Sequence, residues 1–397
     1  MPFKKSKIKL SYNFWFIVIA IAAGLGYLAG VYHYQIEAAI GPVFGYKAHS
    51  GSIDLSSLQE TYNKLAANYD GNLDVNKLID GANDGLVDAA GDAYTIYMTA
   101  KEAKEYSNNL SGNVGAGIGA EIGIRNDKIT IIRVLDNNPA KSSGLMAGDI
   151  VLQVNDEPTS GWTVDRAVSN IKGEDGTTVK LKIQRSDTIK DFSITRAIIN
   201  NPSVEASLSD NIGIITISRF DDETGDLARA AAQKFKSQGV KGIVLDLRGN
   251  GGGYIEAARD VAGIWLSNKV VVTEKSGSIV VGTVKTGDES ILNQIPTVVL
   301  VNSASASASE IVAGALQDYK QATIVGERTY GKGSVQQLIN LSSGAQLKVT
   351  TARWYTPNGV NITQSGIKPN IEVGLTQQDF NSGKDPQLDK AKEVINQ

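Results

Sequence analysis

The sequence predicts a multidomain chain of mixed α+β and α/β architecture, in which a helical segment and a small β-rich domain precede a larger α/β domain. Apolar residues at three- and four-residue spacings run through residues 54–110, strand-like segments with glycine turns follow, and strands alternate with helices after Pro202. A chain of 397 residues is long enough for two or three hydrophobic cores. We therefore expect separate folded units in this order.

The chain begins with a basic segment followed by an apolar one. Four lysines within the first nine residues precede an uncharged run from about Phe14 to Tyr32, which at about 1.5 Å per residue is long enough to cross a bilayer core. Lysines ahead of the run predict that the N-terminus stays in the cytoplasm. We expect residues 1–34 to form a single-pass anchor in the cell membrane, with the rest of the chain extracytoplasmic. A cleaved signal peptide is the alternative.

Two segments connect this predicted anchor to the folded body. Residues 35–52 are rich in Gly, Ala and Ser, which is typical of a tether. Residues 53–111 show helical periodicity, with apolar residues such as Leu55, Leu58 and Tyr62 on one face. Helices of this kind could pack on the main body or on a second copy of the chain.

Residues 112–199 have the pattern of a small β-rich domain. The stretch GNVGAGIGAEIGI, which starts at Gly112, is a glycine-rich turn leading into a short strand. KITIIRVL, DIVLQVN and TVKLKIQR are strand-like, and WTVDRAVSNIK lies between the last two as a predicted helix.

Residues 200–375 alternate between strands and helices. NIGIITIS, KGIVLDLR and PTVVLVN are predicted strands, and each is followed by a predicted helix, the first being TGDLARAAAQKFKSQ at residues 224–238. This alternation favours a largely parallel sheet covered on both faces. Function in such sheets concentrates at the carboxyl ends of the strands, and both the loop GNGGG and the serine-rich stretch SASASAS lie there. Residues 376–397 form a polar tail that we expect to end in a helix.

Composition excludes several classes of function. The net charge of −3 provides no basic face for nucleic acid, and a chain without cysteine has no disulfide, thiolate metal site or cysteine nucleophile. The only two histidines, His33 and His49, precede the folded body, which argues against a Ser-His-Asp triad and against a histidine-ligated metal. We expect neither a metal nor another cofactor.

The serine-rich stretch allows two interpretations, a catalytic turn or a helix cap. Four serines alternate with alanines between a predicted strand and a predicted helix, where backbone N–H groups at the helix start are free to stabilise an oxyanion. The structural alternative is a capping box, with Ser307 as N-cap and Glu310 three residues later. The alternating serines are Ser303, Ser305, Ser307 and Ser309.

Without a histidine, a reactive serine needs another base, and a lysine that has lost its charge through burial can serve. Lys332 lies between Gly331 and Gly333 at the start of a strand-like run. Even offsets on a strand share a face, so Lys332, Ser334 and Gln336 are expected to point the same way, and the amide can orient the lysine. A solvated lysine in a glycine turn is the structural alternative.

The segment VNSASASASEIVAGALQDYKQATIVGERTYGKGSVQ closely resembles the signature of the C-terminal processing peptidases, the tail-specific serine proteases. The resemblance implies a nucleophilic serine 25 residues before the lysine base, which selects Ser307 for Lys332. It also implies that Gln336, four residues after the lysine, supports it. The implied activity is a serine endopeptidase with a Ser-Lys dyad.

The resemblance covers most of the chain beyond the anchor. GAGIGAEIGI with NPAKSSGLMAGDIVLQVND looks like a PDZ domain, which implies a PDZ domain at residues 112–199 and a protease core at residues 200–375. DLRGNGGG resembles the family's D-L-R-x-N-P-G-G, with Gly251 in place of proline. Gln364 and Ser365 stand where the family more often has Gly and a basic residue. Neither difference implies loss of activity.

The implied mechanism assigns further residues. The backbone N–H groups of Ala308 and Gly252 are candidate oxyanion donors, and the loop Gly117-Ile118-Gly119 is the candidate binding loop for a substrate's C-terminal carboxylate. The expected partners are proteins or peptides with free C-termini, the membrane, and a second copy of the chain or an adaptor protein. Two alternatives remain: an inactive scaffold at the membrane, and an acyl-transfer enzyme that is not a protease.

Overall fold

In the computed structural model, residues 12–31 and 53–397 are described, and the chain divides into two units at residues 78 and 79. The first unit holds helix α1 (Tyr12–Val31) and helix α3 (Ser56–Asn68). Within the described residues, no helix has the length and apolar character of a membrane span. The N-terminal lysines, the expected tether, His33 and His49 lie outside the described residues, and the membrane anchor stays a prediction.

The predicted helical region is confirmed, with one strand inside it. Helix α4 (Val75–Asp88) follows α3, and helix α5 (Ala100–Leu110) ends the region. Thr99 and Glu102 form a complete capping box that starts α5, because each side chain bonds the other's backbone N–H. Between α4 and α5, strand β1 (Ile96–Met98) joins a sheet of the core.

The small β-rich domain forms as predicted, around its own core. A main sheet has the order β3-β4-β5-β7-β8 with β6 on β5, and a separate pair joins β2 to β9. Ile131, Leu181 and Ile183 are fully buried in this core. The elements are β2 (Ala116–Gly117), β3 (Ala120–Arg125), β4 (Lys128–Val134), α6 (Pro139–Ser142), β5 (Ile150–Val154), β6 (Glu157–Pro158), α7 (Val164–Ile171), β7 (Thr178–Arg185), β8 (Thr188–Thr195) and β9 (Ala197–Ile198).

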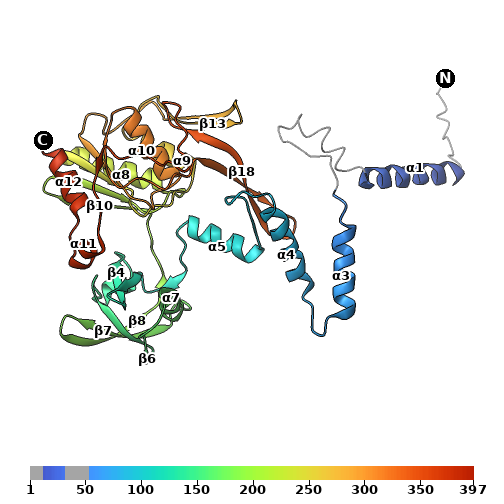
Figure 1. Ribbon diagram of the computed structural model, residues 1–397, viewed down its shortest axis with the longest axis horizontal. Helices are drawn as coiled ribbons and strands as arrows, with labels where there is room; N and C mark the ends of the chain where they lie inside the picture. Colours follow the sequence, from blue (N-terminus) through green and yellow to red (C-terminus); the bar gives the residue numbers. More distant parts are fainter. Residues whose placement is uncertain (1–11, 32–52) are drawn as a thin grey trace, which may run out of the picture. The chain divides into compact units, whose positions relative to one another are not determined.

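The larger domain contains the expected parallel sheet (Figure 1). Its order is β10-β11-β12-β15-β16-β19, and every pair is parallel except β10 with β11. The elements are β10 (Val204–Ser209), β11 (Ile212–Ile217), α8 (Thr224–Gln238), β12 (Gly242–Asp246), α9 (Ile255–Ala262), β15 (Thr297–Val301), α10 (Ala308–Asp318), β16 (Thr323–Gly326) and β19 (Ile371–Glu372).

Strand alternation assigns each face of this sheet to different helices. Ile243, Leu245 and Val299 lie in one core cluster with residues of α8, α9 and α10. Val244 and Val298, the intervening positions, lie in a second cluster with Ala391. Because both faces are buried, the strands read as continuous apolar runs.

The second cluster brings the expected C-terminal tail into the core. This tail consists of helix α11 (Gln377–Ser382) and helix α12 (Pro386–Ile395), and α12 packs on β12, β15 and β16. Arg248, which follows β12, donates to Asp385 at 2.8 and 2.9 Å, immediately before α12. The predicted helix at the end of the tail is therefore present as α12, and it is part of the folded core.

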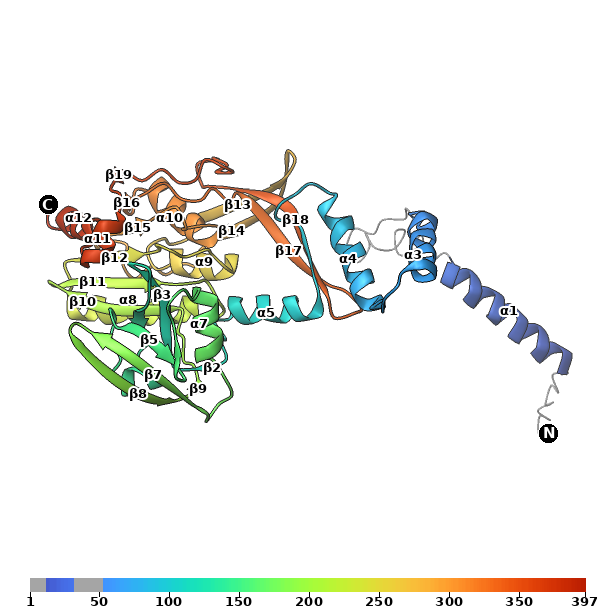
Figure 2. The same cartoon turned by 60° about the horizontal axis from the view of Figure 1, so that its bottom comes forward.

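The structure contains a further sheet that the sequence did not predict. It has the order β1-β18-β13-β14, with β17 also paired to β18, and all its pairs are antiparallel. Figure 2 shows β17 and β18 as a long orange two-stranded ribbon. The remaining elements are β13 (Val270–Ser276), β14 (Ile279–Lys285), β17 (Ser334–Asn340) and β18 (Gln346–Tyr355).

Candidate active site

Three loops meet at one edge of the parallel sheet. Strands β12, β15 and β16 are neighbours, and each is followed by one of the segments singled out in the sequence. The glycine loop follows β12, the serine-rich turn follows β15, and the loop carrying Lys332 follows β16. Since parallel strands end on the same side, the sheet itself gathers these segments.

Ser307 occupies the sharp turn between β15 and α10. It is the N-cap of α10 and has φ 55° and ψ −115°, a backbone conformation that is strained for a residue with a Cβ. The arrangement is a capping box with Glu310, as the structural alternative predicted, and the Ser307 N–H donates to Glu310 Oε2 at 2.8 Å. The cap and the strained turn therefore coexist at one residue.

The other serines of the stretch have structural roles. Ser305 is fully buried and donates to Leu247 O at 2.8 Å, and Ser309 is fully buried and donates to Asn250 O at 2.9 Å. Both bonds attach the serine turn to the glycine loop. Ser303 is exposed. Only Ser307 combines partial exposure with the strained backbone.

The glycine loop lies directly against Ser307. A Cβ built on Gly252, which has φ +103°, would stand 2.7 Å from Ser307 Cβ and 2.8 Å from Ala306 O. Only glycine fits there. Fully buried Asn250 holds the loop, because its Nδ2 donates to Ile217 O at 2.8 Å and its carbonyl accepts from Ala306 N–H at 3.0 Å.

The two candidate oxyanion donors differ in availability. Ala308 is the first residue of α10, so its N–H belongs to the helix start, where N–H groups have no partner within the helix. The Gly252 N–H donates to Asn250 Oδ1 at 2.8 Å. An oxyanion would therefore have to share or displace this bond at Gly252, whereas Ala308 is free of that competition.

Glu310 connects the serine turn to the lysine loop. Its carboxylate is fully buried and accepts four hydrogen bonds of 2.6 to 3.0 Å. A buried carboxylate is tolerated only when such donors replace water. The donors are Ser307 N–H, Gly331 N–H, Lys332 N–H and Thr329 Oγ1.

Lys332 lies in the glycine-framed turn that the sequence suggested. Gly331 has φ +90°, and a Cβ on Gly333 would stand 2.5 Å from Thr363 Oγ1, so both flanking positions require glycine. The Lys332 Nζ lies 5.6 Å from the centre of the Tyr94 ring. Burial lowers the pKa of Lys332, the positive charge of Lys348 lowers it further, and the charge of Glu310 opposes both.

Gln336 lies on β17 beyond the lysine turn. Its Nε2 donates to Ser334 Oγ at 2.8 Å and to Thr350 Oγ1 at 3.3 Å, so the predicted shared face holds for Ser334 and Gln336. The amide is thus held by hydroxyl groups of β17 and β18. Its role toward Lys332 stays a prediction.

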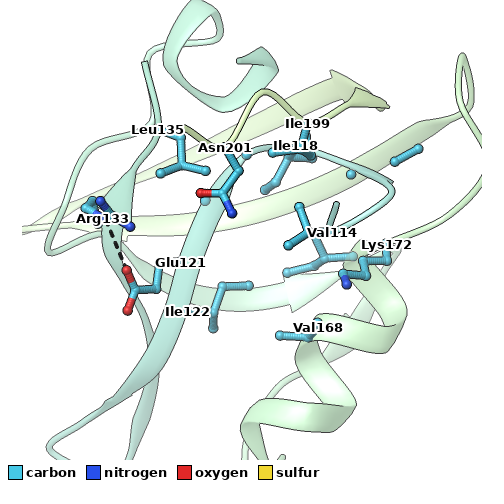
Figure 3. Close-up of a pocket in the computed structure, with 15 residues that line it drawn as sticks. Val114, Ile118, Glu121, Ile122, Arg133, Leu135, Val168, Lys172, Ile199 and Asn201 are labelled. Atoms are coloured by element: carbon cyan, nitrogen blue, oxygen red, sulfur yellow. Dashed lines mark hydrogen bonds and ion pairs between the residues drawn. The ribbon is translucent and has the colours of Figure 1, made fainter. Parts of the chain in front are cut away.

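A separate pocket of about 340 Å³ lies in the β-rich domain, between β3 and α7 (Figure 3). Ile118, Ile122, Leu135 and Val168 give it an apolar lining. The ion pair of Glu121 with Arg133 flanks one side and Lys172 the other. A strand edge beside a helix, with an apolar floor, suits an extended peptide.

The predicted carboxylate loop lines this pocket. Gly117 ends β2, Ile118 is buried, and Gly119 has φ +75°. The carbonyls of Ile118 and Gly119 accept from Ala140 and Leu135 N–H at 2.7 and 2.9 Å. In the part of the chain that the structure describes, the N–H groups of Ile118 and Gly119 have no protein acceptor, which leaves them available to a ligand.

Sequence reasoning missed four residues around the serine turn and Lys332. Glu310 was noted only as a cap, although its position in the motif also placed it near Ser307. Asn250 lies in the quoted glycine loop, but its buried bonds leave no local pattern. Tyr94 and Lys348 reach Lys332 through long-range pairing, which no spacing reveals.

Fold and site together define a class of protein: an α/β core with a serine turn and a glycine loop at one end of its parallel sheet, preceded by a small β-rich domain with an apolar pocket. Residues 211–373 match the model of peptidase family S41, and residues 108–184 match that of the PDZ domain. Residues 211–373 therefore carry a core of the peptidase family S41 type, and a PDZ domain lies ahead of it. The resemblance seen in the sequence is confirmed.

Individual relatives agree with this assignment. The chain is 36% identical over 324 residues to a probable CtpA-like serine protease of Staphylococcus epidermidis and 32% identical over 326 residues to one of Staphylococcus haemolyticus. These matches cover 81% and 82% of this chain but only 65% and 66% of the relatives.

Two solved structures have the same fold. The photosystem II D1 C-terminal processing protease is 27% identical with a TM-score of 0.51, and the match covers 81% of this chain and 87% of that one. A putative S41 protease from Bacteroides fragilis has a TM-score of 0.61 at 15% identity, over 88% of this chain and 99% of that one.

Proposed function

We propose that this protein is a serine endopeptidase in which Ser307 is the nucleophile, Lys332 is the general base and Gln336 supports the lysine. The observation that supports this most directly is Glu310, whose one buried carboxylate binds the backbone N–H groups of both Ser307 and Lys332. This carboxylate therefore couples the position of the serine turn to that of the lysine loop. The names of the relatives, serine protease and C-terminal processing protease, support the same activity.

The proposed reaction has two stages. The neutral amine of Lys332 takes the proton of Ser307 Oγ, and the oxygen attacks the scissile carbonyl. Lys332 then passes that proton to the departing amine, which leaves an acyl-enzyme. Water attacks the ester carbonyl while Lys332 accepts a water proton, and Ser307 Oγ regains a proton as the acid product leaves. The N–H groups of Ala308 and Gly252 stabilise the oxyanions, and losing one such donor typically costs about 3 kcal/mol.

We also propose that the PDZ domain captures the free C-terminus of a substrate, so that cutting occurs near that end. The support is the pocket between β3 and α7, with the loop Gly117-Ile118-Gly119 at one end. Its apolar lining favours substrates with apolar C-terminal residues.

Anchoring in the cell membrane, with the catalytic domain outside the cytoplasm, belongs to this proposal and is supported by the apolar run after the N-terminal lysines. We expect that the full-length protein is extracted from membranes only by detergent. A variant that lacks residues 1–35 is expected to be released without detergent.

The central test compares the wild type with Ser307→Ala on an unstructured protein that ends in apolar residues. Wild type is expected to release C-terminal fragments, and Ser307→Ala is expected to release none. Cleavage should become faster with rising pH as Lys332 loses its proton. A cleavage rate that does not change between about pH 5 and pH 10 would argue against a lysine base. An inactive scaffold predicts no difference between wild type and variant.

Matched serine variants sharpen this test. Ser303→Ala changes an exposed serine in the same stretch and should cleave like the wild type. Ser305→Ala and Ser309→Ala each lose a buried hydrogen bond, worth about 1 kcal/mol of folding free energy, but should keep measurable activity. Equal loss of activity in all four variants would refute the assignment of Ser307.

A further inference from the structure

A second lysine belongs to the surroundings of Lys332. Lys348 is half-buried on β18, in register with Leu338 of β17, and lies two residues from Thr350 on the same face of the strand. Gln336 bonds Thr350 on one side and Ser334 on the other. A row of polar side chains therefore leads along β17 and β18 from the lysine turn to Lys348.

The segment before the PDZ domain covers both lysines with aromatic rings. Lys332 Nζ lies 5.6 Å from the centre of the Tyr94 ring, and Lys348 Nζ lies 5.1 Å from that of Tyr106. Thr95 fixes this segment on β18, since its Oγ1 accepts from Thr350 N–H at 3.1 Å. Across residues 53–397, neither lysine forms an ion pair.

The groups that face Lys332 come from four segments. Tyr94 comes from the segment before β1, Glu310 from α10 and Lys348 from β18. The lysine loop takes part through Tyr330, which is hydrogen-bonded to Tyr94. Burial alone lowers the pKa of Lys348, whereas that of Lys332 is lowered by burial and by Lys348. Because like charges repel, the two lysines resist being charged at the same time.

We propose that Lys348 is a positioning residue for the reaction: its half-buried ammonium repels a second ammonium on Lys332 and so keeps that amine able to accept the Ser307 proton. The negative charge of Glu310, needed to hold the two loops together, favours protonated Lys332. The positive charge of Lys348 acts against this effect. The inference rests on the proposed role of Lys332.

The first measurement is the pH dependence of kcat/KM for the full-length protein. Lys348→Gln should move the acid limb of the profile to higher pH and leave the alkaline plateau in place, with about a tenfold loss at a fixed acidic pH for each unit of movement. Lys348→Arg keeps the charge and should restore the wild-type limb. Lys285→Gln removes an exposed lysine from β14 of the same sheet and should change nothing. A limb that stays in place in Lys348→Gln would overturn the proposal.

The second measurement does not depend on cleavage. In the full-length Ser307→Ala protein with ¹³C-labelled lysine side chains, the Lys332 signal is assigned through Lys332→Arg and titrated by NMR. Adding Lys348→Gln should raise the midpoint of that signal, and an unchanged midpoint would overturn the role of Lys348. The two measurements can also disagree. If the midpoint rises but the cleavage assay shows that Ser307 is not needed, the electrostatic coupling is upheld and the proposed function is refuted.

Discussion

Ser307 and Glu310 show how single residues make a strained turn from an ordinary helix start. Glu310 would be a routine capping residue if it bonded only Ser307, but its buried carboxylate also holds Thr329, Gly331 and Lys332. Removing a buried charged group with its hydrogen-bond partners typically costs about 3 to 5 kcal/mol, which is about a fifth or more of a domain's stability. The charge is therefore part of the architecture of the site.

Gly252 offers a prediction at this scale. Gly252→Ala would push a methyl group to within 2.7 Å of Ser307 Cβ at a backbone conformation disfavoured for alanine, so we expect cleavage to fall by at least about a hundredfold. The measurement is kcat/KM on an unstructured protein substrate, with circular dichroism to establish that the variant folds.

Gly251 provides the matched control one residue away. A Cβ there meets nothing within 4 Å, and φ is not positive, so Gly251→Ala should keep nearly full activity. Similar losses in the two variants would mean that general stiffness of the loop, rather than contact with Ser307, is what matters.

At the scale of elements, the parallel strands gather the site and α12 supports them from behind. The three loops of the candidate site follow β12, β15 and β16, and α12 packs on these same strands. Its Ala391 is fully buried, and Ile395 contacts Gly242 at the start of β12. The helix closes the face opposite to α8, α9 and α10.

Truncation after Lys384 should accordingly destabilise the core. It would expose Val244, Val298 and Leu300 and leave Arg248 without Asp385, with an expected loss of several kcal/mol and a lower thermal unfolding midpoint. Removing only the exposed Asn396 and Gln397 should leave the midpoint unchanged. Equal midpoints for both truncations would contradict the role of α12.

At the scale of the whole molecule, the PDZ domain is an insertion whose ends lie together. Strand β2 at its entry pairs with β9 at its exit, and Asn201 Nδ2 donates to Gly112 O at 3.4 Å. The domain can therefore be excised without separating the flanking segments. This arrangement allows substrate capture and chemistry to be tested independently.

Deleting residues 113–198 and joining the ends by a short glycine linker should leave a folded core that has lost its preference for free C-termini. The comparison uses two versions of one unstructured substrate, with a carboxylate or an amide at the C-terminus. The wild type is expected to favour the carboxylate form, and the deletion variant to treat both alike. An unchanged rate and an unchanged preference would refute PDZ capture of the tail.

Several elements could be predicted because their information is local. The helix at residues 224–238 was predicted at its observed bounds, since an amphipathic pattern ends at Gly239, which adopts the left-handed conformation typical of a helix end. The apolar runs of β11, β12 and β15 predicted a covered parallel sheet for the same reason. Ser307 was selected by a family spacing, and its strained backbone agrees with that choice.

The rest depended on pairing between distant segments. Strand β1 pairs with β18 some 250 residues later, and this pairing carries Thr95 to Thr350 and Tyr94 to Lys332. Local periodicity cannot specify such a partner, because many strands of similar composition compete for it. For the same reason the second sheet and the packing of α12 were not foreseen.

The sequence by itself determined the order of domains, the local elements and the residue types of the candidate site. The tertiary structure decided which of four serines is strained and which are buried supports, and it decided that one carboxylate joins the serine and lysine loops. It also assigned Tyr94 and Lys348 to the surroundings of Lys332. Burial and long-range hydrogen bonds, which exist only when strands have paired, set the charge and the geometry of those groups.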